Sequence, residues 1–190
     1  MTIGVIDRRL FVRLAACSTL FNPAKAAAKE NDVTGSSHDF DFQIGSWRVR
    51  HRKLKQRLVG SADWEEFDGT STMRLILGGS GNIEDNELQM ASGAYRAVAL
   101  RSYDPSQGQW SIWWLDGRAP LTLGVPVLGA FKDGVGQFLA DDVQDGRHVR
   151  VRFLWLGSDT GTPRWEQAMS TDGGSSWETN WTMDFRRAQP

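Results

Sequence analysis

Residues 47–52 read Trp-Arg-Val-Arg-His-Arg, an alternation that places Trp47, Val49 and His51 on one side and three arginines on the other. Successive side chains of a β-strand point to opposite faces, so this pattern predicts a strand with one apolar face and one wet face. Helical periodicity is poor along the whole chain, which favours an all-β domain. The same period of two recurs downstream, in residues 110–115, 149–155, 164–169 and 177–186.

Turn signals separate these runs. Asp-Gly pairs favour tight hairpins because both residues tolerate positive φ. Eight to ten short strands without helices between them indicate an antiparallel meander. A meander with one apolar face closes most simply into an up-and-down barrel, and a β-sandwich is the alternative. The barrel domain is expected over residues 40–187. The Asp-Gly pairs lie at residues 116–117, 133–134, 145–146 and 172–173.

The composition is that of a globular protein. In 190 residues, 40% are hydrophobic and 24% charged, which argues for one domain with a real core and against disorder. The 22 basic and 23 acidic residues nearly balance and form no basic block, so nothing indicates nucleic acid as a partner. No stretch approaches the ~20 apolar residues of a spanning helix, so no transmembrane segment is expected in the mature chain.

The first 39 residues have a different character. Arg8-Arg9, the following x-Phe-Val-Arg, a short weakly apolar run and a small-x-small site ending at Ala26 resemble a twin-arginine export signal. We therefore expect an export signal at residues 1–26 and a periplasmic or otherwise exported mature protein. If this segment is a plain N-terminal arm instead, the protein is cytoplasmic. Residues 27–39 are polar and turn-rich, which predicts a flexible linker.

Nine tryptophans against two tyrosines are the unusual feature of the composition. A cluster of indoles forms either a core filled by large aromatic side chains or an aromatic ligand pocket. Barrels of about eight strands are likewise either packed with side chains or able to hold one small ligand, so both outcomes stay open. Alternation predicts that a ligand cavity would be lined by Trp47, Met73, Trp110, Trp114, Trp155, Trp165, Trp181 and Met183.

Two short motifs carry a resemblance to a known family. Gly45-x-Trp47 at the first strand and the closing Phe185-Arg186-Arg187 resemble the lipocalin/calycin pattern. In that pattern the tryptophan plugs the closed end of the barrel and a late arginine packs across it. More closely, the chain is similar to a bacterial lipocalin-like family of unknown function over about residues 40–187. The resemblance implies a fold and no activity. The segments that carry it are residues 40–51, 113–118, 165–168 and 172–181.

His51 is the polar residue of most interest because alternation places it inside the barrel. A lone histidine among apolar neighbours is a core group, a hydrogen-bonding partner for a ligand, or a general acid or base. Asp116 and Arg118 flank an expected turn at the barrel mouth, where a carboxylate and a guanidinium could orient a polar ligand end.

Two functional hypotheses follow. The first is binding of a small hydrophobic or aromatic molecule in a Trp-lined cavity. The alternative is a cofactor-free lyase, isomerase or hydrolase acting on a small aromatic substrate in the same cavity. In that case His51 would serve as acid or base, and Asp116 or Arg118 would stabilise charge.

Neither a metal nor haem is expected. A three-histidine metal site would need every histidine of the chain, including His38 in the predicted linker. Among relatives of the calycins, nitrobindins bind haem through one histidine, which would have to be interior and near the C-terminal strands. The last histidine here, His148, starts a strand beside Gly146 and Arg147, so the sequence predicts no cofactor.

Overall fold

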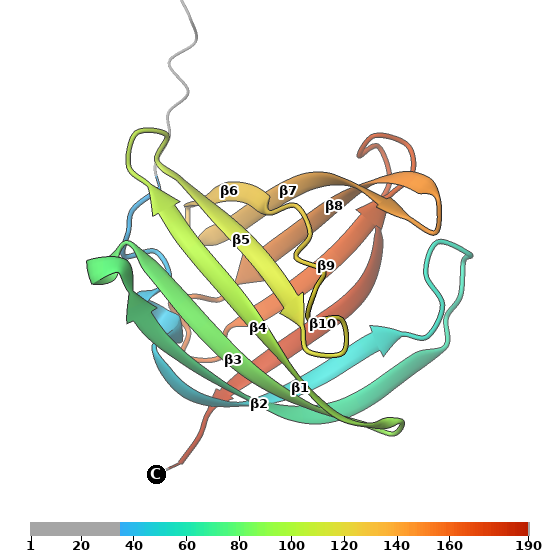
Figure 1. Ribbon diagram of the computed structural model, residues 1–190, viewed down its shortest axis with the longest axis horizontal. Helices are drawn as coiled ribbons and strands as arrows, with labels where there is room; N and C mark the ends of the chain where they lie inside the picture. The colour runs from blue at the N-terminus through green and yellow to red at the C-terminus, as the bar shows by residue number, and fades with distance from the viewer. Residues whose placement is uncertain (1–34, 190) are drawn as a thin grey trace, which may run out of the picture. The chain divides into compact units, whose positions relative to one another are not determined.

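In a computed structural model of the chain, which describes residues 35–189, ten antiparallel strands close into a barrel (Figure 1). Each strand pairs with its neighbours in sequence, and β1 pairs with β10 to complete the ring. The predicted all-β, up-and-down antiparallel barrel is confirmed. The strands are β1 Gly45–Leu54, β2 Trp64–Ile76, β3 Gly81–Met90, β4 Gly93–Asp104, β5 Gln109–Asp116, β6 Val127–Lys132, β7 Val135–Gln144, β8 Arg147–Leu156, β9 Arg164–Ser170 and β10 Glu178–Arg187.

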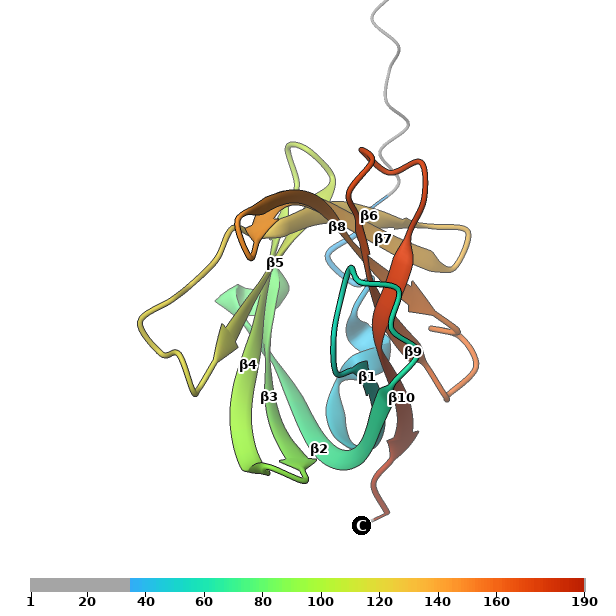
Figure 2. The same ribbon diagram turned by 90° about the vertical axis from the view of Figure 1, so that its right-hand side faces the viewer.

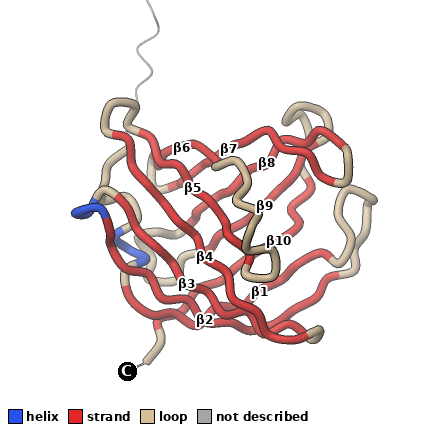
Figure 3. The backbone as a smooth tube through the Cα atoms, in the orientation of Figure 1, coloured by secondary structure: helices blue, strands red, loops and turns tan. Residues whose placement is uncertain are grey.

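Helical structure in the described part is confined to two short 3-10 turns, η1 Asp41–Gln43 and η2 Leu77–Gly79 (Figure 3). None of the described helices is long and apolar enough to cross a membrane. The export signal predicted for residues 1–26 lies outside the described residues and stays a prediction. The last five residues of the predicted linker, 35–39, are described. There the Tyr103 hydroxyl donates to the Gly35 carbonyl at 2.6 Å, and the Trp110 indole donates to the Ser36 carbonyl at 3.0 Å.

The residues that precede β1 seal one end of the barrel. Phe40 is 1% exposed and lies among the aromatic rings at the bottom of the interior. Its ring meets those of Trp110, Phe131 and Trp155 edge-on, with centroids 5.0 to 5.9 Å apart. Such edge-to-face pairs add to the apolar burial of the rings, so this end forms a compact floor.

Trp47 completes this floor. Its indole N–H donates to the Gln43 carbonyl at 2.7 Å, and the Arg187 guanidinium lies 3.9 Å from the centre of its ring. Arg187 also donates to the Phe42 carbonyl at 2.9 Å, which ties the end of β10 to the chain entering β1. This is the tryptophan plug with a late arginine across it that the calycin resemblance implies.

The inner surface of the barrel has two chemically different halves. Aromatic and aliphatic side chains cover the inward faces of β5 and β8–β10, where Trp110, Trp155 and Phe185 are buried. The inward faces of β2, β3 and β4 mix polar and small side chains with the larger Phe67, Met73, Leu88 and Tyr95. The buried polar residues on this second half are Ser71, Asn82, Glu84, Asn86 and Arg101.

The alternation expected for residues 177–185 is wrong at its beginning. The register of β10 against β9 shifts between Thr179 and Trp181, because Asn180 is an extra, fully buried residue of a β-bulge. Asn180 accepts a hydrogen bond from the Gln167 amide at 2.7 Å. Trp177 therefore does not share the inward face of Trp181. It lies before the strand, with the Arg152 guanidinium 4.3 Å from its ring centre.

The barrel wall has a gap at the end opposite Phe40. β5 and β6 pair through three residues only, from Trp110–Gly129 to Ile112–Val127. Beyond them no described strand fills the space between residues 113–116 of β5 and 141–144 of β7. The loop of residues 117–126 connects β5 to β6 there, and it bows outward in the view into the open end (Figure 2).

Candidate functional site

A cavity of about 430 Å³ lies at this open end, beside the gap in the wall. Its volume is within the range of sites that hold small organic molecules. Four residues of the 117–126 loop lie along it, namely Ala119, Thr122, Gly124 and Val125. Seven of the inward-facing side chains that line it are apolar, namely Ile112, Trp114, Val127, Ala140, Val151, Phe153 and Met169, and four are polar, namely Asp116, Asp142, Gln144 and Gln167.

Below this cavity the barrel interior is nearly full. A hollow between Arg101, Trp114 and Trp155 measures about 20 Å³, which is room for about one water molecule. Trp181 meets Trp114 and Trp165 edge-on, with ring centroids 5.6 and 5.5 Å apart. Tight interlocking of this kind is typical of a protein core.

The eight residues predicted to line a cavity therefore divide into three groups. Trp47, Met73, Trp110 and Trp155 belong to the sealed end and are at most 2% exposed. Trp165, Trp181 and Met183 are buried in the middle of the barrel. Trp114 alone among the eight lines the 430 Å³ cavity.

His51 lies inside the barrel, as alternation predicts, and it is 1% exposed. Its ring stacks on Phe67 with a centroid distance of 4.7 Å, and its Nδ1 accepts the Trp181 indole N–H at 3.3 Å. A neutral imidazole that accepts at Nδ1 carries its proton on Nε2. Burial lowers the pKa of His51 to about 3, so the ring is neutral at physiological pH. No carboxylate in the described part of the chain hydrogen-bonds to it, and its predicted catalytic role stays a prediction.

This burial predicts a pH-dependent stability. The unfolded chain takes up a proton on His51 near pH 6.5 and the folded protein does so only near pH 3, so stability is full above pH 6.5 and falls as the pH drops from there towards 3. The expected slope is about 1.4 kcal/mol per pH unit below pH 6. Urea unfolding between pH 5 and 7 measures it, and His51→Phe should flatten the curve. An unchanged slope in His51→Phe would show that His51 is protonated in the folded state.

Asp116 and Arg118 lie together at the mouth, as the sequence predicts. Arg118 donates from Nη2 and Nε to the two carboxylate oxygens of Asp116, at 2.6 and 3.0 Å. These hydrogen bonds hold the pKa of Asp116 below its ordinary value. The Arg118 guanidinium also lies 3.6 Å from the centre of the Tyr95 ring. Asp116 contributes to the wall of the 430 Å³ cavity, but no hydrogen bond among the described residues joins it or Arg118 to His51.

Sequence reasoning missed a buried polar network on the inner wall. Glu84 and Arg101 form an ion pair in which the side chains are 2% and 3% exposed. Ser71 donates to Glu84 at 2.7 Å, and Arg101 also donates to the Asn82 side-chain carbonyl at 2.9 Å. Arg101 lies 4.7 Å from the centre of the Phe40 ring, so the network rests directly on the floor of the barrel. Buried charges of this kind are held by their partners and not by solvent.

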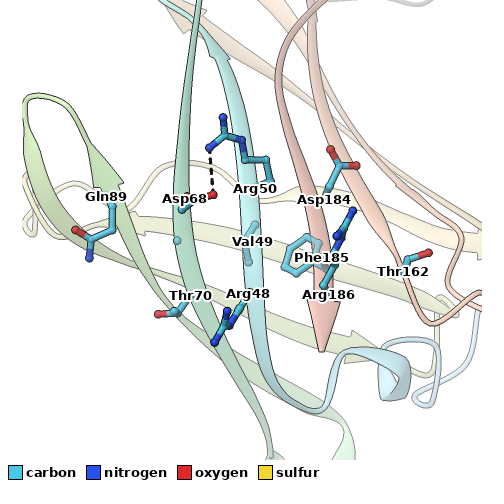
Figure 4. A pocket seen from close by; sticks show the side chains of 11 residues that line it. Arg48, Val49, Arg50, Asp68, Thr70, Gln89, Thr162, Asp184, Phe185 and Arg186 are labelled. Carbon is cyan, nitrogen blue, oxygen red and sulfur yellow. Dashed lines mark hydrogen bonds and ion pairs between the residues drawn. The ribbon is translucent and has the colours of Figure 1, made fainter. Parts of the chain in front are cut away.

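A larger hollow, of about 960 Å³, lies on the outer surface over β1, β2 and β10 (Figure 4). Its walls carry outward-facing polar side chains, several of which are already paired. Arg50 donates to Asp68 at 3.1 Å and to Glu66 at 3.0 Å. Asp184 accepts from Arg164 at 2.7 Å. We favour the smaller cavity at the mouth as a ligand site because its apolar lining continues the barrel interior.

No metal centre is found among residues 35–189, where no three side chains of His, Cys, Asp or Glu gather in a ligating arrangement. His38 is exposed and lies 2.9 Å from the Asp41 carboxylate. His148, at the start of β8, is also exposed.

No known family matches the chain, and no curated protein matches it. One solved structure with a similar fold is the S-type phycobiliprotein lyase CPES from Guillardia theta. It superposes with a TM-score of 0.50 and 11% sequence identity, and the match covers 80% of this chain and 91% of that chain. At this identity the likeness concerns the fold alone. Together with the closed barrel and the Trp47–Arg187 floor, it defines a lipocalin-like barrel fold.

Proposed function

We propose that this barrel binds a small aromatic or hydrophobic molecule at its open end. The observation that carries the proposal is the 430 Å³ cavity, which is lined mostly by apolar inward-facing side chains and lies above a closely packed interior. Burial of apolar surface there supplies the binding free energy. Trp114 and Phe153 offer the aromatic surface, and the gap between β5 and β7 gives access from the side.

Trp114→Ala should weaken the binding of a neutral aromatic probe. With 2-naphthamide, calorimetric titration should give a dissociation constant about 10 to 100 times higher in Trp114→Ala than in the wild type, because loss of a buried aromatic contact removes about 1.5 to 3 kcal/mol. The matched control is Trp113→Ala. Trp113 is the adjacent residue of β5 and faces the outside of the barrel, so its loss should leave the affinity within about two-fold.

Two results would contradict the proposal. One is the absence of any saturable heat of binding in the wild-type protein. The other is an equal loss of affinity in Trp113→Ala and Trp114→Ala, which would place the probe on the outer surface or indicate a general loss of structure. Near-ultraviolet circular dichroism of both variants separates the last two cases.

A further inference from the structure

Lys53 is the next inward-facing residue of β1 after His51, and it lies towards the open end. Its ammonium is 3.9 Å from the centre of the Trp181 ring, and Trp181 lies directly opposite Lys53 in the β1–β10 register. The Trp181 ring in turn meets Trp114 edge-on at 5.6 Å, and Trp114 lines the mouth cavity. The amine therefore contacts the cavity through the Trp181–Trp114 pair, and Lys53 is not itself a lining residue.

Lys53 has no ion-pair partner among the described residues, although two carboxylates are near. Glu65 lies opposite it in the β1–β2 register, but its carboxylate accepts the Ala91 backbone N–H at 3.2 Å. The Asp116 carboxylate accepts hydrogen bonds from Nε and Nη2 of Arg118. An ammonium that has lost much of its water and gained no carboxylate is a poorly compensated charge.

Tyr95 gives a second, independent sign of an unfilled polar site. Its side chain is 8% exposed, and its hydroxyl is buried with no hydrogen-bond partner in the described part of the protein. A buried hydroxyl without a partner costs about 1 to 3 kcal/mol, so such groups are rare unless a ligand or water satisfies them. Lys53 and Tyr95 share the same charged surroundings, which are Arg57, Arg118, Asp116 and Glu65.

We propose that the ligand of this barrel carries a carboxylate, held at the mouth by the Lys53 ammonium and the Tyr95 hydroxyl, with the aromatic body against Trp114. This inference rests on the proposed function and specifies its ligand class as small aromatic acids. Arg57 lines the same cavity and is likewise without an ion pair among the described residues, so it adds a second positive charge near the carboxylate. Charge-assisted hydrogen bonds of this kind are about twice as strong as neutral ones.

The charge of Lys53 makes this selectivity depend on pH. Burial and the nearby Arg57 and Arg118 lower the pKa of Lys53 to about 8, against the opposing effect of Asp116 and Glu65. The ammonium is present below that pKa and is lost as the pH rises through it. A bound carboxylate favours the charged amine and moves the loss to higher pH. The preference for an acid should therefore be complete at pH 6.5 and mostly gone at pH 10.

The test compares 2-naphthoate with 2-naphthamide, which have nearly the same shape and differ in charge. In the wild type at pH 6.5, calorimetry should show naphthoate binding at least 10 times more tightly. Lys53→Met should abolish this preference, and near-ultraviolet circular dichroism reports that the variant is folded. Tyr95→Phe should weaken naphthoate binding about 3- to 10-fold. Lys55→Met is the matched control, because Lys55 is on the outer surface, 3.1 Å from Asp63.

The possible failures are distinguishable. If naphthamide and naphthoate bind equally well, or if Lys53→Met keeps the preference for the acid, the carboxylate site is overturned and the binding function survives. If neither probe binds the wild-type protein, the proposed function fails, and this inference fails with it.

Discussion

Trp47→Ala should lower the free energy of unfolding by about 3 to 5 kcal/mol, the range measured when a large aromatic is removed from a core. The indole is 1% exposed and packs on Phe185 at a centroid distance of 6.1 Å. Its loss leaves a cavity in the floor, removes the ring beneath the Arg187 guanidinium and leaves the Gln43 carbonyl without its donor. The expected loss is a large share of the ~5 to 15 kcal/mol that stabilises a typical domain.

Urea unfolding followed by far-ultraviolet circular dichroism measures this loss. Trp177→Ala is the matched control, since that indole lies before β10 and its loss should change stability by less than about 1 kcal/mol. A loss below about 1 kcal/mol in Trp47→Ala as well would contradict the conclusion that Trp47 stabilises the barrel from its floor.

Arg101→Met should destabilise the protein by about 3 to 5 kcal/mol, because it leaves the buried Glu84 carboxylate without a positive partner. The side chain of Glu84 is 2% exposed, so water does not replace the guanidinium. Asn82 would also lose the donor that now lies 2.9 Å from its carbonyl oxygen. The same urea experiment measures the effect.

The double variant Arg101→Met, Glu84→Leu separates the cost of an unpaired buried charge from the cost of lost packing. Replacing both charges with apolar groups of similar size is often neutral, so the double variant should recover most of the stability lost in Arg101→Met. If Arg101→Met unfolds at the same urea concentration as the wild type, the ion pair does not stabilise the fold as a buried pair should.

Much of the fold was predictable because, in one half of the barrel, inward apolar side chains alternate with outward ones along each strand. Trp110, Ile112 and Trp114 face inward and Trp113 faces outward, as period-two alternation requires. The Asp-Gly pairs at 133–134 and 145–146 do form the β6–β7 and β7–β8 hairpins, with positive φ at both residues. In these segments the alternation pattern and the turn residues agree with the packing of the folded barrel.

The other half of the barrel escaped sequence analysis for a physical reason. β3 alternates Asn82, Glu84 and Asn86 inward before Leu88, so most of its buried face is polar and its hydrophobic signal is weak. Its charge is compensated only by Arg101 of the next strand, and a partner in another strand is invisible to a pattern read along one segment. The bulge at Asn180 escaped for a similar reason, since one extra residue reverses the faces of everything before it.

The candidate site was only partly predictable. Asp116 and Arg118 were identified at the mouth from the turn signal, but alternation cannot tell whether inward indoles fill a barrel or line a cavity. That outcome depends on how closely the strands approach one another. Lys53 did carry a signal, because it continues the inward series of Trp47 and His51 by two residues. Nothing local, however, shows that the carboxylate opposite it is engaged elsewhere.

Because β5 and β6 pair through only three residues, the barrel wall is less stable against local opening there than elsewhere. Strand pairing continues on every other side of the ring, whereas residues 113–116 of β5 and 141–144 of β7 lack a strand between them. Local opening follows the weakest cooperative unit of a structure. We therefore expect local opening of the wall to begin at this seam, and the binding proposed beside Trp114 would need no change in the nine remaining strand interfaces.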